Sequence, residues 1–316
     1  MITRYDNPTE GLSFEAGPAV LCLGNFDGVH SGHRKLIGEA RQLADELGLS
    51  LRVISFHPHP RVVLGDTTFR PIYEESEKVR LMEETGLVDE LLTLEFSREL
   101  MRMDPELFYQ SLLLGRYHAA AIAVGDDYHF GYHGAGNPAL LTRLSEAAGI
   151  PCRVVDRLVY EGEPVSSTRI RESLESGDVS KAAALLGRPY YLVGTVSQGK
   201  HLGRKFRHPT VNVFLKEDLL HPRYGVYASR TTVVGAGGET LEGITNVGVN
   251  PTFGGEAPRA ETFLFDYSGD LYGKTLRVEL LNFIRPEKTF ESAKALGEEI
   301  NRNIRAAEDF FDGHDE

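Results

Sequence analysis

Two histidines stand three residues apart where a glycine-rich turn leads into a helical pattern. The turn, Gly24–His33, reads Gly-Asn-Phe-Asp-Gly-Val-His-Ser-Gly-His and lies between the apolar run Ala19–Leu23 and the helical spacing of Ser31–Leu47. A helix start offers free N–H groups and the positive end of the helix dipole, and both favour phosphate. Because residues three apart share one side of a helix, His30 and His33 can face the same ligand. The pattern predicts a polyphosphate site for attack on an α-phosphate, which needs charge neutralisation and no enzyme nucleophile.

The glycines of this turn let the backbone approach a ligand closely, and Gly32 leaves room for a triphosphate between the histidines. The alternative interpretation is a plain glycine turn with two helix-capping histidines. A strand before the motif and a helix after it favour the phosphate site.

A second polar cluster opens another helical segment. Val165–Arg171 reads Val-Ser-Ser-Thr-Arg-Ile-Arg, and Arg171 follows Ser167 by one helical turn. Hydroxyls at a helix start and an arginine one turn later can form a phosphate clamp. Considered alone, an ordinary helix cap with solvated arginines explains the segment about as well.

The most basic stretch of the chain is Gly199–Asn212, which contains four cations and no acid in a protein of net charge −12. A positive glycine loop can hold polyphosphate. Thr210 and Asn212 are two apart on a predicted strand, so they share a face and suit a hydrated Mg²⁺ that bridges phosphates. The alternative is a solvated basic hairpin.

The elements that position these residues change in kind along the chain. In the first half, apolar runs alternate with helical spacing; the runs are 19–23, 51–56, 119–124 and 152–155, and the helical patterns are 31–47, 74–85, 105–114 and 138–148. This alternation predicts an α/β, Rossmann-like domain with a parallel sheet covered on both faces. Its ligands belong at the carboxyl ends of the strands.

After Gly187 the helical period fades, and short strands separated by glycine-rich turns follow at 191–196, 211–214, 225–234, 261–265 and 276–283. They predict a small antiparallel β-barrel. Arg285-Pro286-Glu287 is expected to open a C-terminal helix with an apolar face that includes Phe290 and Ile300. A length of 316 residues suits two domains, which we expect at 1–186 and 187–316.

The composition limits the class of partner. A net charge of −12 without a basic stripe is unfavourable for binding nucleic acid or an anionic membrane. Cys22 and Cys152 lie in apolar runs and form neither a disulfide framework nor a zinc site. No apolar run approaches the length of a membrane span, and the first residues lack a signal-peptide core. We therefore expect a cytoplasmic protein that acts on small molecules.

The first half resembles the FMN adenylyltransferase domain of prokaryotic bifunctional riboflavin kinase/FAD synthetases. The matching segments are Gly24–His33, Phe56–Pro60, Gly125–Gly131 and Ser166–Arg171, in the same order over nearly all of residues 15–186. Where many relatives carry an Arg and an Asp after Gly131, this chain has Gly134 and Asn137. The resemblance implies that His30 and His33 hold the phosphates of ATP, that Arg171 acts from the opposite side, and that the ATP site includes Gly24, Phe26, Asp27, Gly32, Asp126, Ser167 and Thr168.

The second half resembles the riboflavin kinase domain of the same family, through Pro209-Thr210-x-Asn212, Asn246-Val247-Gly248, Glu261 and Arg285-Pro286-Glu287. The resemblance implies that Thr210 and Asn212 bind Mg²⁺ and ATP and that Glu261 is the base for the riboflavin 5′-hydroxyl. It also adds three residues to the ATP site of the kinase: Gly199, Gly203 and Arg204. The alternative for Glu261 is an exposed strand carboxylate.

Three functional hypotheses follow. The first is a bifunctional enzyme that converts riboflavin to FMN and FMN to FAD, with ATP as substrate and Mg²⁺ as cofactor. The second is an FMN adenylyltransferase whose barrel only binds flavin, since the chain has Phe206-Arg207-His208 and Val211 where relatives usually have Leu-Gly-Phe and Ala. The third is another nucleotidyltransferase with a His-x-Gly-His motif, such as a cytidylyltransferase or an aminoacyl-tRNA synthetase, which the kinase-like second half disfavours.

Overall fold

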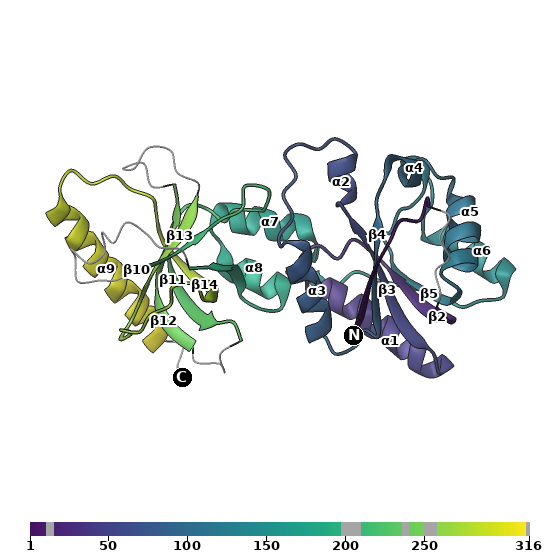
Figure 1. Cartoon of the computed structure of the whole chain (residues 1–316), viewed down its shortest axis with the longest axis horizontal. Coiled ribbons are helices and arrows are strands. Elements are labelled where there is room, and N and C mark those ends of the chain that lie inside the picture. The colour runs from purple at the N-terminus through teal and green to yellow at the C-terminus, as the bar shows by residue number, and fades with distance from the viewer. Residues whose placement is uncertain (11–15, 197–209, 236–239, 250–257, 314–316) are drawn as a thin grey trace. The chain divides into compact units, whose positions relative to one another are not determined.

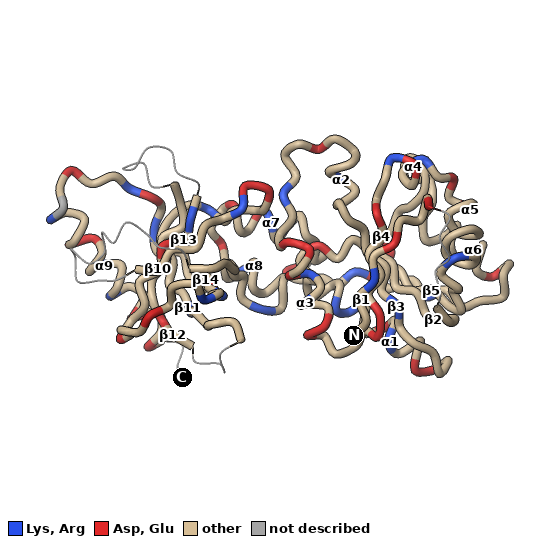
Figure 2. The backbone as a smooth tube through the Cα atoms, in the orientation of Figure 1, with Lys and Arg blue, Asp and Glu red and all other residues tan. Residues whose placement is uncertain are grey.

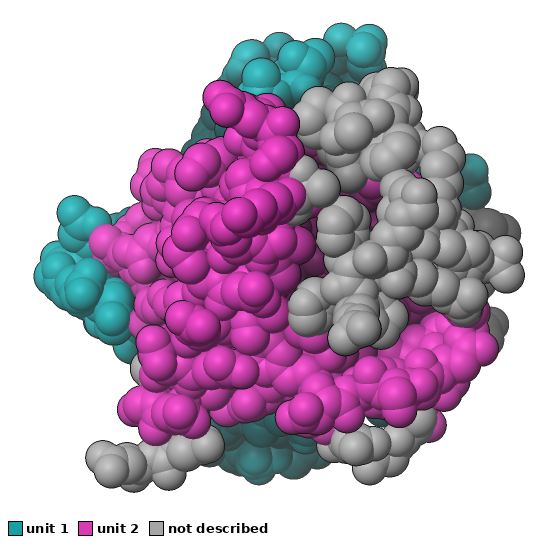
Figure 3. All heavy atoms as spheres, turned by 90° about the vertical axis from the view of Figure 1, so that its left-hand side faces the viewer, with its two compact units in different colours: residues 1–167 teal, residues 168–316 magenta. Residues whose placement is uncertain are grey.

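The computed structural model describes residues 1–10, 16–196, 210–235, 240–249 and 258–313. The chain forms two compact units, Met1–Ser167 and Thr168–Glu316 (Figure 1, Figure 3). This division lies before the boundary at Gly187 that the sequence suggests. It does so because the chain just ahead of Gly187 packs with the second unit: the amide of Arg223 donates to the carbonyl of Leu174 at 2.8 Å. Where the two functional domains separate remains a prediction.

The first unit is built on a sheet of six parallel strands (Figure 1). Their order across the sheet is β1-β4-β3-β2-β5-β6. The strands are β1 (Ile2–Asp6), β2 (Ala19–Leu23), β3 (Ser50–His57), β4 (Glu90–Glu95), β5 (Ala119–Gly125) and β6 (Cys152–Val155). The strand order reverses between β2 and β5, and the carboxyl ends of strands at such a point are where open α/β sheets bind ligands.

Helices connect these strands: α1 (Ser31–Leu47), α2 (Pro60–Val63), α3 (Glu75–Glu84), α4 (Arg98–Met101), α5 (Pro105–Leu107), the π-helix η1 (Phe108–Arg116), the 3₁₀ turn η2 (Tyr132–Gly134) and α6 (Pro138–Ala148). A short hairpin, β7 (Val159–Tyr160) and β8 (Glu163–Pro164), follows β6. The chain crosses the sheet in one direction through α1 and α3 and in the other through η1 and α6. Right-handed crossovers then put the two pairs on opposite faces, which confirms the predicted Rossmann-like α/β fold.

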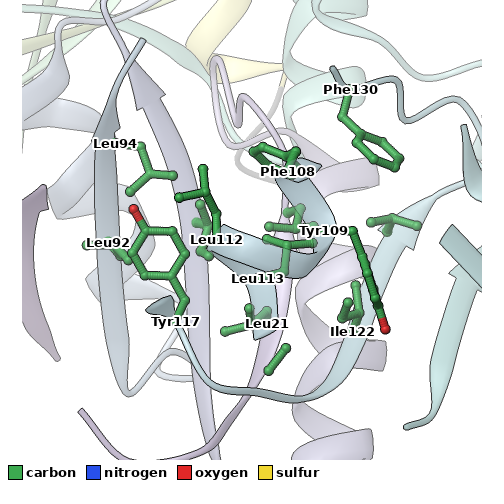
Figure 4. Close-up of a cluster of buried hydrophobic side chains, with 14 of the residues drawn as sticks. Leu21, Leu92, Leu94, Phe108, Tyr109, Leu112, Leu113, Tyr117, Ile122 and Phe130 are labelled. Atoms are coloured by element: carbon green, nitrogen blue, oxygen red, sulfur yellow. The ribbon is translucent and has the colours of Figure 1, made fainter. Parts of the chain in front are cut away.

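One face of the sheet packs against the π-helix. The side chains of Phe108, Tyr109, Leu112 and Leu113 lie in one buried cluster with strand residues Leu21, Leu92, Leu94 and Ile122 (Figure 4). The end of η1 is held at β1, because Arg116 and the hydroxyl of Tyr117, at 2.6 Å, both bind the carboxylate of Asp6. The helix predicted over 105–114 is therefore present, with π geometry in its second part.

The second unit contains an antiparallel sheet of order β10-β13-β12-β11-β14-β9. Two helices precede the sheet and one follows it. The elements are α7 (Ser167–Ser176), α8 (Val179–Leu186), β9 (Tyr190–Thr195), β10 (Thr210–Phe214), β11 (Gly225–Val233), β12 (Thr240–Gly248), β13 (Arg259–Leu264), β14 (Thr275–Pro286) and α9 (Ala293–Asp312).

This sheet curls until its two end strands approach each other. A Cβ on Gly194 of β9 would lie only 2.4 Å from Cγ1 of Val213 on β10. Helix α9 covers one face, where Ala307 and Phe311 pack with Ile244 of β12. The predicted small antiparallel barrel with a terminal helix is confirmed.

Some elements differ from those predicted. Strands β1, β4, β7, β8 and β12 are additional, and the start of the last helix was predicted wrongly. Arg285 pairs with Val226 of β11, so the strand continues to Pro286. The helix begins at Ala293, after Ser292, whose hydroxyl accepts a hydrogen bond from the amide of Ala295 at 3.2 Å. The pairing of β14 with β11 keeps Arg285 and Pro286 in the strand, although the residues after them have helical spacing.

Candidate active sites

The two histidines form the start of helix α1. His30 is its N-cap residue and His33 its third residue. The amide of His30 donates to Nδ1 of His33 at 3.3 Å, and the amide of His33 donates to Nδ1 of His30 at 3.2 Å. The rings stack with their centroids 3.5 Å apart. This reciprocal cap fixes both imidazoles at the positive end of a helix whose first turn contains no acid.

The turn before the helix is held in an unusual backbone conformation. Phe26 has a φ of 52° and Val29 a φ of 41°, both in the left-handed region. Such a conformation costs about 1–3 kcal/mol for a residue other than glycine. Both side chains are fully buried, and their packing offsets the strain. The turn is thereby shaped before any ligand arrives.

Two glycines of the turn make room for its own rings. A Cβ on Gly24 would lie 3.1 Å from the ring of Phe26, and one on Gly32 would lie 3.2 Å from the ring of His30. Phe26 in turn contacts the ring of His33 edge-on, with centroids 5.2 Å apart. Glycine at these positions therefore sets where the histidine rings lie.

Hydrogen bonds to neighbouring segments hold the turn. The hydroxyl of Ser55 donates to the carbonyl of Asn25 at 3.3 Å. The amide of Ile72 donates to the buried carboxylate of Asp27 at 3.0 Å, and the hydroxyl of Ser167 donates to the carbonyl of Asp27 at 2.9 Å. Asp27 therefore positions the turn through its contacts with neighbouring segments.

Asp126 follows strand β5 and forms an ion pair with Arg157, whose Nε lies 2.9 Å from Oδ1. Arg157 lies two residues after the end of β6 and was not among the predicted site residues, because nothing in the sequence distinguishes it from other arginines. A role for Asp126 in nucleotide binding stays a prediction.

Helix α7 begins at Ser167, as its hydroxyls predict, and carries Thr168 and Arg171 in its first turns. Their phosphate-binding roles also stay predictions.

Strand pairing brings the second set of residues together. Asn212 on β10 lies directly opposite Glu261 on β13, and Glu261 lies opposite Asn246 on β12. Directly opposed residues of antiparallel strands project from the same face. The hydroxyl of Thr210 donates to Oε1 of Glu261 at 2.7 Å. Glu261 is partly buried and hydrogen-bonded, unlike the exposed strand carboxylate of the alternative interpretation.

Asn246 was not among the predicted site residues, although the sequence contains a signal for it in the motif Asn246-Val247-Gly248. Its position beside Glu261 follows from the pairing of β12 with β13, and β12 was not predicted. The other kinase-site candidates, Gly199, Gly203 and Arg204, lie outside the described residues, as do the departures at 206–208.

Charges are mixed along both units. Lys and Arg are interspersed with Asp and Glu over the described part of the chain (Figure 2). Among the residues that the structure describes, no group of three or more His, Cys, Asp or Glu is placed to hold a metal ion.

Comparison with known proteins decides the family. The FAD synthetase family model matches residues 13–169, and the riboflavin kinase family model matches residues 186–311. The bifunctional riboflavin kinase/FMN adenylyltransferase of Bacillus subtilis is 36% identical over 96% of this chain and 96% of its own. The chain belongs to the bifunctional riboflavin kinase/FMN adenylyltransferase family. The Escherichia coli member is 34% identical, over 92% of each chain.

This family membership makes the chain a transferase with both catalytic domains present. A crystal structure described as a macrolide-efflux protein from Streptococcus pneumoniae matches it with a TM-score of 0.84 and 29% identity, over 96% of this chain and 97% of that one. That match supports the fold. Within the described residues, none of the helices is both long and apolar enough to cross a membrane.

Proposed function

We propose that this member of the family makes both flavin cofactors. The second unit phosphorylates riboflavin with ATP to give FMN, and the first transfers the adenylyl group of a second ATP to FMN to give FAD and pyrophosphate. The observation that carries the proposal is that one chain contains two separate constellations. One is the capped pair His30 and His33 on α1, and the other is Glu261 with Thr210 and two flanking asparagines.

For adenylyl transfer, a phosphate oxygen of FMN attacks the α-phosphorus of ATP, and the bond to the β-phosphate breaks. The chain needs to stabilise charge on the phosphate oxygens and on the departing pyrophosphate. The start of α1 suits this task because amides, dipole and two fixed imidazoles lie together there. We assign ATP binding also to Gly24, Phe26, Asp27, Gly32, Asp126, Ser167, Thr168 and Arg171.

For the kinase, Glu261 takes the proton of the riboflavin 5′-hydroxyl while that oxygen attacks the γ-phosphorus and ADP leaves. The hydroxyl of Thr210 binds one carboxylate oxygen at 2.7 Å and so fixes the orientation of the other. A base held in one orientation can come within hydrogen-bond reach of the substrate hydroxyl. Gly199, Gly203 and Arg204 complete the proposed ATP site.

Magnesium fits the oxygen donors of the kinase site. Thr210 uses its proton for Glu261 and keeps its lone pairs, and the side-chain oxygen of Asn212 lies on the same strand face. Two neutral oxygens suit an ion that keeps several waters and is shared with substrate phosphates. When bound, Mg²⁺ neutralises charge that develops on the transferring phosphoryl group.

The experiment incubates the purified chain with Mg²⁺, ATP and either riboflavin or FMN, and separates the flavins by chromatography. FMN and FAD from riboflavin support the proposal. FAD from FMN without FMN from riboflavin would instead favour a barrel that only binds flavin, the reading suggested by Phe206-Arg207-His208. Chelation of Mg²⁺ is expected to stop both reactions.

A further inference from the structure

A buried lysine lies beneath the histidine turn. Lys78 projects from α3, and its side chain is only 9% exposed. Its ammonium lies 2.8 Å from Oγ of Ser55 and 2.7 Å from Oε2 of Glu75. A charged side chain is rarely buried without a partner or a purpose. Nothing in the chemistry described above uses Lys78.

The lysine determines which way the hydroxyl of Ser55 points. An ammonium can only donate hydrogen bonds, so Oγ of Ser55 accepts from Lys78 and has one proton left to give. That proton goes to the carbonyl of Asn25 at 3.3 Å. Ser55 is itself fully buried, so no solvent competes for it. Lys78 therefore acts on the histidine turn through one intermediate side chain.

The same group is tied into the sheet. Ser55 on β3 is paired in register with Thr93 on β4, and Oγ1 of Thr93 donates to Glu75 at 3.2 Å. Nδ1 of His57, two residues after Ser55, lies 3.5 Å from the same carboxylate. The group thus lies near the carboxyl ends of two strands, where contacts from both strands hold it.

The histidine turn contains backbone strain that its surroundings must hold in place, because Phe26 and Val29 have positive φ angles. Asn25 directly precedes this strained stretch, and its carbonyl is held by Ser55. We infer that Lys78 is a positioning residue for adenylyl transfer: it orients Ser55, which fixes Asn25 and through it the turn that carries His30. The inference rests on the proposed function of the first unit.

The test measures kcat and KM for FAD formation from FMN and ATP in three variants. Lys78→Met with Glu75→Gln removes both charges together and leaves no unpaired one. Ser55→Ala removes the intermediate hydroxyl, and the third variant combines all three changes. Displacing catalytic groups by about 1 Å can lower a rate about 100-fold, so we expect kcat to fall by about 10–100-fold in the first two variants. Lys78 acts on Asn25 only through Ser55, so the two losses should not add. The kcat of the combined variant should therefore be no lower than that of the slower of the first two variants.

Lys78→Arg keeps a donor and should recover part of the rate. The matched control is Arg80→Gln on the same helix, since Arg80 pairs with Glu77 and Glu84; it should behave as wild type. Riboflavin kinase activity, measured on the same samples, should not change. Wild-type kcat in Ser55→Ala, or losses that multiply in the combined variant, would overturn the inference. A wild-type chain that makes no FAD would instead refute the proposed function.

Discussion

His33 is the residue on which adenylyl transfer depends most directly in this interpretation. Its ring is fixed against His30 and Phe26 at the start of α1. In His33→Ala, FAD formation from FMN should fall by about 10²–10³, the usual loss when one charge-stabilising donor is removed. The measurement is a steady-state assay with FMN and ATP, alongside riboflavin phosphorylation on the same sample.

Kinase activity should persist in His33→Ala, because that reaction belongs to the other unit. The matched control is His118→Asn, an exposed position with a φ of 52° that asparagine tolerates. It should leave both activities unchanged. Near-normal FAD synthesis by His33→Ala would refute the role given to this histidine.

Glu261 carries the corresponding prediction for the kinase. Glu261→Gln keeps the size of the side chain and can still accept from Thr210, but it removes the base. FMN formation from riboflavin should fall by about 10²–10⁴, while FAD formation from FMN stays normal. The control is Glu242→Gln on the neighbouring strand, whose carboxylate pairs with Arg230 at 3.2 Å. Equal loss of both activities in Glu261→Gln would show that the residue is structural.

At this scale the sequence indicated the histidine pair and Glu261, because their motifs are local in the chain. It did not indicate Ser55 or Lys78, and it contained Asn246 only within a motif, without a role as a site residue. Each of these acts through a neighbour from a distant segment: Ser55 through Asn25, Lys78 through Ser55, and Asn246 through its register with Glu261. Contacts of this kind depend on strand pairing, which spacing along one segment does not contain.

At the scale of elements, the close pairing of two barrel strands depends on a glycine. A Cβ on Gly243 of β12 would lie 2.1 Å from the carbonyl oxygen of Phe263 on β13. Because that oxygen is backbone, it cannot turn aside as a side chain would. Gly243→Ala should therefore destabilise the second unit by about 1–3 kcal/mol and lower its riboflavin kinase activity at elevated temperature. Thermal melting checks the stability.

The control is another glycine of the same unit. Gly297 lies inside α9, and a Cβ there would meet nothing within 4 Å. Gly297→Ala should raise stability by about 0.5–1 kcal/mol, because alanine is less free than glycine in the unfolded chain and suits a helix. If Gly243→Ala and Gly297→Ala had the same melting temperature, the close contact between β12 and β13 would not determine the stability of the barrel.

The elements that were predicted well have a clear pattern in one segment. Helices α1 and α6 and strands β2 and β6 begin and end as their spacing predicts. Strand β1 was missed because it is a largely exposed edge strand without an apolar run. The end of β14 was misjudged because Arg285 pairs with β11, a long-range contact. Local pattern predicts an element where apolar residues form a continuous run or recur at helical spacing, and it fails where pairing with a distant strand decides.

For the whole molecule, the question is where one function ends and the other begins. The family models leave residues 170–185 between them. In the structure this stretch, α7 and α8, packs with the second unit: Ala182, Leu185 and Leu186 are fully buried, and the carbonyls of Leu174 and Ser176 accept from Arg223. Yet the residues proposed to serve adenylyl transfer extend to Arg171. Helix α7 would thus be needed by the second unit for stability and by the first for chemistry.

This conflict yields the last prediction, which uses four fragments. A fragment from Thr168 to Glu316 should fold and phosphorylate riboflavin. One from Gly187 should be less stable by several kcal/mol, since it loses buried apolar side chains of these helices, Leu185 and Leu186 among them, at about 1.5–3 kcal/mol each. Of the complementary fragments, Met1–Leu186 should convert FMN to FAD. Met1–Ser167 should fold around its own sheet but fail in this reaction, because it lacks Thr168 and Arg171.

Circular dichroism, thermal melting and the two flavin assays distinguish the outcomes. Equal melting of the fragments from Thr168 and from Gly187 would mean that α7 and α8 add nothing to the barrel, and the boundary at Gly187 would be the physical one. FAD synthesis by Met1–Ser167 would show that the start of α1 suffices and that Arg171 has no part in the reaction. A folded fragment from Thr168 that binds riboflavin without yielding FMN would assign the barrel a regulatory role.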